Sequence, residues 1–330
     1  MDNKITEENI NTVAYNLANL RKKDLSLTER SLAHLDEAGR EMAKLLCTGN
    51  GITECDEFIT AYRKFMKNLF CEDDERITET PEQNRKKLKS VDSEDAVNFS
   101  VLLCQSICKI KSEQGAPLTH ADFFAVYTAR TAGERIAYLR NPYSDTAFRI
   151  FSEVIKNASV SYPRDFAAVC EEVYYGRCRY CILPVETSDE GALSGFRRLI
   201  AKYELCPILS CPVSTAGGSQ TTEFALFAKN IEFPPIDNKT VCEKRKLFSF
   251  RLDAPTEKSF NKTVRALHLY GLRILKMDSS PVAWDEGRYS FEITVDCGEK
   301  DLTSALLYLI LEIPEYTPIG YYTQISLSGG

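Results

Sequence analysis

Several features that would place a protein in a membrane or on nucleic acid are missing from this sequence. No uninterrupted apolar stretch approaches the roughly 18–20 residues of a membrane-spanning helix, and residues 1–23 lack the apolar centre of a signal peptide. Positive charge is not in excess either, because 41 Lys and Arg residues stand against 47 Asp and Glu residues. Proteins that bind nucleic acid usually carry a basic face. We therefore expect a cytoplasmic protein with no nucleic-acid or membrane partner.

The sequence also offers few residues in metal-ligand patterns. Its three histidines lie far apart, and its 12 cysteines are scattered through apolar stretches, where a reduced cysteine packs as a small apolar side chain. Cys178 and Cys181 have the spacing of a zinc knuckle, with Cys206 and Cys211 as a conceivable second pair. In a strand, however, alternation would turn Cys178 and Cys181 to opposite faces. We expect reduced cysteines, no metal and no cofactor.

What the sequence does contain is enough apolar residues for two or three domains. Of 330 residues, 44% are hydrophobic and 27% are charged, as in globular proteins. Residues 1–130 show helical periodicity, which is clearest where Phe58, Tyr62 and Phe65 form one apolar stripe. The acidic and then basic segment 71–90 is typical of a solvated linker or long loop. The first predicted domain is therefore helical and spans residues 1–130.

From residue 135 the pattern changes to strands that alternate with helices, which predicts an α/β unit over residues 135–231 with a largely parallel sheet. In segment 179–193 an apolar strand leads to Glu186 and Ser188, in a polar turn before the next helix. Ligands of open α/β sheets bind at the carboxyl ends of strands, so both are candidate site residues. The alternative is a turn whose polar residues only cap the next helix, and spacing alone favours it.

Residues 244–330 have the element order βαββαβ, which predicts a small ferredoxin-like domain. GLRILKMDSSP at 271–281 is similar to the G-I-N-L-x-K-I-E-S-R-P motif of the ACT domain in prephenate dehydratases, and IGYY at 319–322 to its terminal L-G-S-Y. PVETSDEG at 184–191 resembles the P-x-E-N-S-x-x-G motif of the same family, and TTEF at 221–224 its N-x-T-R-F segment. The resemblance covers residues 135–325. It implies a single lobe of a periplasmic-binding-protein-like dehydratase domain, followed by an ACT domain.

The family converts prephenate to phenylpyruvate and is inhibited by phenylalanine through the ACT domain. The resemblance therefore implies catalytic roles for Glu186, Ser188 and Thr222, and an effector site at Asp278, Ser279 and Pro281. Glu223, however, stands where the family has an arginine, and this replaces attraction for a dicarboxylate by repulsion. The family also has a second lobe between the last two strands of this unit, whereas only the short segment 214–221 joins them here.

The N-terminal helices stand where bifunctional relatives carry a chorismate mutase domain. LRKK at 20–23 resembles the L-R-x-x-I-D start of that domain, and Arg21, Arg40 and Lys111 could supply the cations that it needs. The spacing does not match, and the alternative is a helical domain with a structural role.

These observations predict a dehydratase-like protein without ordinary dehydratase activity, which senses an amino acid such as phenylalanine or has a regulatory or assembly role. We expect a homodimer or higher homo-oligomer formed through the ACT domain. The alternative is an active enzyme of aromatic amino-acid biosynthesis, which would act on prephenate with a partner subunit or on chorismate in the helical domain. A third hypothesis is that the protein only mediates assembly.

Overall fold

The computed structural model describes residues 29–46, 52, 55–70, 94–119, 122–124, 134–214, 220–232, 234, 236, 241–282, 287–298, 300 and 302–327. In these residues the chain forms eight helices and ten strands. It divides into two compact units, each built from three segments of the sequence. The helical unit comprises Met1–Phe124, Ala254–Leu272 and Lys300–Tyr316, and the sheet unit comprises Ala125–Asp253, Arg273–Glu299 and Thr317–Gly330. The predicted linker at 71–90 lies outside the described residues.

The helical unit contains α2 (Glu29–Leu45), α3 (Asp56–Phe70), α5 (Glu94–Glu113), α9 (Glu257–Leu269) and α10 (Leu302–Glu312). The predicted stripe on α3 is confirmed, because Phe58, Tyr62 and Phe65 are all buried. Helix α10 is apolar on nearly every side and is buried along most of its length, as expected for a helix without a polar face.

A carboxylate with 14% exposure joins four of these helices. Glu312 of α10 accepts hydrogen bonds from Tyr62 of α3 at 2.8 Å and from Ser100 of α5 at 3.1 Å, and Lys262 of α9 lies 3.5 Å away. Helix α5 also packs against both α9 and α10. The two helices of the βαββαβ segment therefore form one core with the N-terminal helices, an arrangement that the sequence pattern does not indicate.

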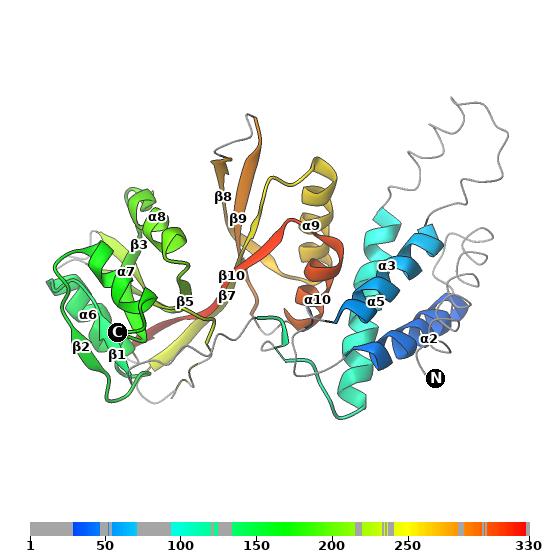
Figure 1. Ribbon diagram of the computed structural model, residues 1–330, viewed down its shortest axis with the longest axis horizontal. Coiled ribbons are helices and arrows are strands. Elements are labelled where there is room, and N and C mark those ends of the chain that lie inside the picture. Colours follow the sequence, from blue (N-terminus) through cyan, green and yellow to red (C-terminus); the bar gives the residue numbers. More distant parts are fainter. Residues whose placement is uncertain are drawn as a thin grey trace. The chain divides into compact units, whose positions relative to one another are not determined.

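The first part of the sheet unit has the strand order β2-β1-β3-β6-β5 (Figure 1). Strand β1 pairs in parallel with β2 and β3, whereas β6 is antiparallel to both of its neighbours. The prediction of a largely parallel sheet is therefore wrong for β6. Its connection to β5 is too short for the crossover that parallel neighbours need. The strands are β1 (Arg135–Ala137), β2 (Ser159–Ser161), β3 (Tyr180–Thr187), β4 (Gly191–Ala192), β5 (Cys206–Ser214) and β6 (Thr221–Ala228).

Three helices cover the two faces of these strands. Helix α6 (Pro142–Phe151) packs on one apolar cluster, and α7 (Phe166–Tyr174) and α8 (Ser194–Lys202) pack on the cluster of the opposite face. Figure 1 shows the three helices beside the short strands at the end of the sheet. Asn141 caps α6 and Asp165 caps α7 through their side chains, so both helices begin where polar residues supply the missing acceptors.

The sheet continues with β10-β7-β9-β8, comprising β7 (Val241–Leu252), β8 (Arg273–Pro281), β9 (Tyr289–Asp296) and β10 (Tyr316–Leu327). Strand β9 is antiparallel to β7 and β8, and the predicted βαββαβ order of elements is present. Strand β10 also pairs in parallel with β5, which makes one continuous sheet. A Cβ atom on Gly320 would lie 2.5 Å from two ring carbons of Pro207, so this close approach of β10 to β5 requires glycine.

Candidate functional site: a charged pocket in the sheet unit

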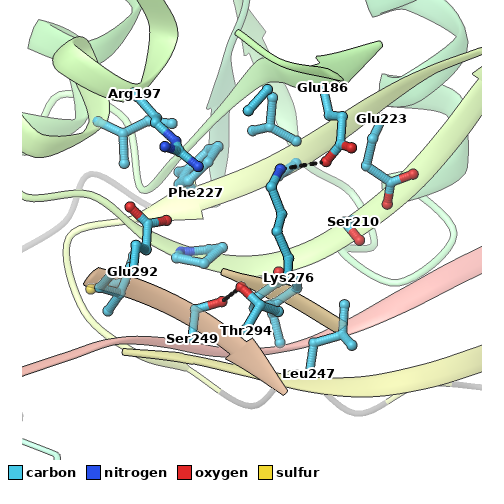
Figure 2. Close-up of a pocket in the computed structure, with 18 of the residues that line it drawn as sticks. Glu186, Arg197, Ser210, Glu223, Phe227, Leu247, Ser249, Lys276, Glu292 and Thr294 are labelled. Carbon is cyan, nitrogen blue, oxygen red and sulfur yellow. Dashed lines mark hydrogen bonds and ion pairs between the residues drawn. The ribbon is translucent and has the colours of Figure 1, made fainter. Parts of the chain in front are cut away.

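A pocket of about 900 Å³ lies within the sheet unit (Figure 2). One side is formed by β3, β5, β6 and α8, and the other by β7, β8, β9 and β10. Its charged lining residues are four acids and four bases: Glu186, Glu204, Glu223, Glu292, Arg197, Arg245, Arg251 and Lys276. The volume falls in the range of small-molecule sites in proteins. The pocket is therefore the candidate functional site.

Strand alternation decides which of the dehydratase-like residues reach this pocket. Thr221 and Glu223 of β6 line it, but Thr222 between them does not. Glu186 and Ser188 also line it, and Glu186 stands opposite Glu223 in the pairing of β3 with β6. The structure thus brings two predicted catalytic positions together with Glu223, and leaves Thr222 outside.

The turn after β3 is a small hairpin, and its polar residues do not cap a helix. Thr187 pairs with Gly191 of β4, which has the positive φ of 69° that favours glycine. The N-cap of α8 is Leu193, which makes no side-chain capping bond. Ser188 instead accepts a hydrogen bond from the backbone of Thr221 at 3.2 Å. The interpretation of this turn as a helix cap is therefore wrong.

A chain of alternating charges connects the two sides of the pocket. Lys276 of β8 lies 2.7 Å from Glu186 and 3.8 Å from Asp278, and Arg197 of α8 pairs with Asp278. The predicted catalytic residue Glu186 and the predicted effector residue Asp278 therefore share one lysine. Ser279 and Pro281 follow on β8, where both are exposed and neither lines the pocket.

Glu223 is a partly buried acid of the pocket. Gln324 of β10 donates a hydrogen bond to its Oε1 at 2.8 Å, and no Lys or Arg nitrogen of the described residues lies within 4 Å of its carboxylate. Burial raises the pKa of Glu223 above 4.5; Ser210 and Gln324 oppose this shift, Glu186 adds to it, and Arg245 opposes it. In Figure 2 its carboxylate lies next to Ser210, below Glu186.

Ser210 on β5 is 2% exposed and lines the pocket. Its hydroxyl lies near enough to Glu223 to lower the pKa of that acid, but it makes no hydrogen bond of ordinary geometry with any described residue. Buried hydroxyls without a partner are uncommon in native proteins and call for an explanation. Ser249 and Thr294, on the opposite wall, are by contrast joined by a hydrogen bond of 2.8 Å.

Several of these lining residues could not be recognised as site residues from the sequence. Ser210, Gln324 and Arg245 lie in strands whose alternation predicts burial or exposure but not a shared pocket. Lys276 belongs to the segment GLRILKMDSSP and matches the lysine of the family motif, so the resemblance already contained a signal for this residue.

The mutase-like residues do not form a described site. Arg21 lies outside the described residues. Arg40 is exposed on α2, whereas Lys111 of α5 is 8% exposed. None of the described helices is long and apolar enough to cross a membrane.

The two cysteines with zinc-knuckle spacing are buried in one apolar cluster. The argument from strand alternation does not apply to them, because β3 begins at Tyr180 and Cys178 precedes it. Burial raises the pKa of Cys178 to about 11 and also raises that of Cys181. Within the described ranges, no three or more His, Cys, Asp or Glu side chains are grouped to hold a metal ion.

No protein-family model and no curated protein matches this sequence. Among solved structures, the chain is similar to prephenate dehydratase from Streptococcus mutans, with a TM-score of 0.48 and 22% identity over 58% of this chain and 98% of that one. It is similar to prephenate dehydratase from Arthrobacter aurescens in complex with L-Phe, with a TM-score of 0.41 and 13% identity over 57% and 89%. GqqA, described as a novel type of quorum-quenching acylase, has a TM-score of 0.43 and 16% identity over 58% and 96%. The solved structures that this chain resembles thus include prephenate dehydratases, with the likeness extending over little more than half of its length.

Proposed function

We propose that this protein is a relative of the prephenate dehydratases that lacks ordinary dehydratase activity and binds an amino acid in a regulatory or assembly role. The observation that carries the proposal is the pair formed by Glu186 and Glu223. These acids face each other across β3 and β6 and both line the pocket. A site for prephenate would need cations or many donors there, because that substrate has two carboxylates.

The size of the repulsion between Glu223 and a substrate carboxylate supports the proposed lack of dehydratase activity. Two like charges 4 Å apart at an effective dielectric constant of 20 repel by about 4 kcal/mol. Lys276 neutralises Glu186, but Glu223 has no cation of the described residues within 4 Å. A carboxylate of the substrate next to Glu223 would therefore meet a negative charge that Arg245 offsets only from beyond 4 Å.

The pocket nevertheless retains what a small ligand needs. The second lobe of the dehydratase family has no counterpart in segment 214–221, but β7, β8 and β9 provide an opposite wall. The lining carries equal numbers of acids and bases, which suits a zwitterion better than a dianion. These features support binding of an amino acid, for which phenylalanine is the first candidate from the motif resemblance.

An ACT domain assignment for residues 244–330 is part of the proposal. The βαββαβ order of elements and the strand order β10-β7-β9-β8 support it. Strand β8 is at the end of the sheet order, and its Met277 side chain is 48% exposed. The outer edge of β8 pairs with no other described strand, and such an edge supports assembly into a homodimer or higher homo-oligomer.

The test is to incubate the full chain with prephenate and to measure phenylpyruvate, with an active dehydratase as a positive control for the substrate. We expect no phenylpyruvate above the rate without protein, and turnover at an ordinary enzymatic rate would overturn the proposal. Calorimetry with the twenty amino acids should detect heat of binding for at least one of them. If none binds, the amino-acid part of the proposal is wrong, and light scattering then decides whether the protein only assembles.

A further inference from the structure

One corner of the pocket combines a partly buried acid, Glu223, with a buried hydroxyl of Ser210 that has no hydrogen-bond partner among the described residues. Glu223 and Ser210 line it together, and Glu186 stands on the adjacent strand β3. Gln324 satisfies one oxygen of Glu223, but no cation of the described chain approaches that carboxylate within 4 Å. A partly buried charge without a close counter-charge is unfavourable. Among the described residues, no positively charged donor therefore hydrogen-bonds to Glu223 or Ser210 in this corner.

Lys276 does not fill this role. Its Nζ lies 2.7 Å from Glu186 and 3.8 Å from Asp278, so its charge is already shared by two acids. Figure 2 shows the Lys276 side chain reaching Glu186, and Glu223 and Ser210 lie to the right of this ion pair. A primary ammonium group has three donors and no acceptor, and it could bond to the Glu223 carboxylate and to the Ser210 hydroxyl together.

A second charged group of the pocket, Arg245, suits the carboxylate of an amino acid. Arg245 of β7 lines the pocket and makes no ion pair within 4 Å with a described residue. The other cations of the lining are engaged, because Arg197 pairs with Asp278 and Arg251 lies 2.6 Å from Asp253. Glu223 and Arg245 therefore influence each other only from beyond 4 Å, and the exposed guanidinium of Arg245 can bond a carboxylate in bidentate fashion.

We propose that the pocket takes small molecules with a primary ammonium group, which binds Glu223 and Ser210, and that a ligand carboxylate is accepted at Arg245. This inference rests on the proposed function, since it assigns the amino acid to this pocket and states which of its groups is essential. The ammonium contact is the more enclosed of the two, because Ser210 is buried and Glu223 partly buried, and it determines the class of ligand. The carboxylate contact is exposed and contributes less, because solvent screens charges at the surface.

The experiment uses three sets of probes on the full chain: the twenty amino acids, the primary amines that share their side chains, and the carboxylic acids that lack the amino group. We expect at least one amino acid or amine to bind, and none of the carboxylic acids. The Glu223→Gln variant keeps the shape of the side chain and should weaken binding by at least about 30-fold, as for the loss of one partner of a buried charge pair. Circular dichroism checks that the variant is folded.

Glu153→Gln is the matched control. Glu153 does not line the pocket, its side chain is 33% exposed, and it pairs with Lys156 at 3.0 Å. We expect this variant to bind as the wild type does, whereas Ser210→Ala should weaken binding by several-fold without unfolding the protein.

The outcomes separate this inference from the proposed function. If amino acids bind but Glu223→Gln binds them as tightly as the wild type, the ammonium site is wrong and amino-acid binding stands. The same conclusion follows if the carboxylic acids bind as tightly as the amino acids. If amines bind through Glu223 but no amino acid does, the inference stands and the proposed function fails. Binding of none of the probes overturns both.

Discussion

Replacing Gly320 by alanine tests whether the contact between β10 and β5 holds the two parts of the sheet unit together. The new Cβ would lie 2.5 Å from both Cγ and Cδ of Pro207 and 3.2 Å from its carbonyl oxygen. Carbon atoms ordinarily approach each other to about 3.5–4.0 Å, so the overlap is about 1 Å. The proline ring cannot rotate away, and one of the two strands must move.

The expected loss of stability follows from two opposing effects. Forcing an extra methyl into a packed site is unfavourable by about 1–3 kcal/mol. Replacing glycine by alanine in a strand is favourable by about 0.5–1 kcal/mol, because glycine loses more conformational freedom on folding. We therefore expect Gly320→Ala to destabilise the sheet unit by about 1–2 kcal/mol. In a unit of this size each kcal/mol corresponds to about 2–4 °C of Tm.

Native-state hydrogen exchange of the β5 and β10 amides is the suitable measurement, because it reports on this unit separately from the helical one. Gly195→Ala on α8 is the control, since nothing lies within 4 Å of the position that its Cβ would take. This control should be neutral or stabilising. The Pro207→Ala background removes both ring carbons and should abolish most of the effect. Unchanged exchange in Gly320→Ala would refute the reasoning.

Three further predictions concern single side chains. Tyr62→Phe removes the 2.8 Å hydrogen bond to the partly buried carboxylate of Glu312, and denaturation should show a loss of about 1.5–3 kcal/mol in the helical unit. The folded-state pKa of Glu223 is raised above 4.5, so wild-type stability should fall as pH rises from below 4.5 through the folded-state pKa. Glu223→Gln should remove this decline, as measured by Tm against pH. Lys276→Met should change stability by less than about 1 kcal/mol in urea denaturation, because its pair with Glu186 is partly exposed.

Each of these predictions has a control or an outcome that would contradict it. Tyr143 is 44% exposed, and Tyr143→Phe should leave stability unchanged; a similar loss in both variants would contradict the role of Glu312. Lys229 lowers the pKa of Glu204 by hydrogen bonding and by its charge, so this acid adds stability above 4.5 that is lost as the pH falls through the folded-state pKa. Glu204→Gln should thus alter the pH profile in the opposite sense to Glu223→Gln. A large loss in Lys276→Met would mean that the ion pair stabilises the fold.

Much of the local structure could be predicted from the sequence. The stripe of Phe58, Tyr62 and Phe65 predicted α3, and the βαββαβ order of residues 244–330 matches β7 to β10 with α9 and α10. Apolar periodicity determines these elements, because it fixes which face of a helix or strand can be buried. The same periodicity predicted the strand before Glu186, but it gave no sign that β3 and β4 form a hairpin there.

The sequence by itself determined the elements and the charges, and the tertiary structure decided which of them meet. Glu186 pairs with Lys276 across 90 residues of sequence, so two motifs that suggested separate sites line one pocket. Gln324 reaches Glu223 only because β10 pairs with β5. Glu312 likewise joins α10 to the N-terminal helices. Contacts between distant segments depend on strand pairing and close packing, and alternation within one segment carries no information about its partner.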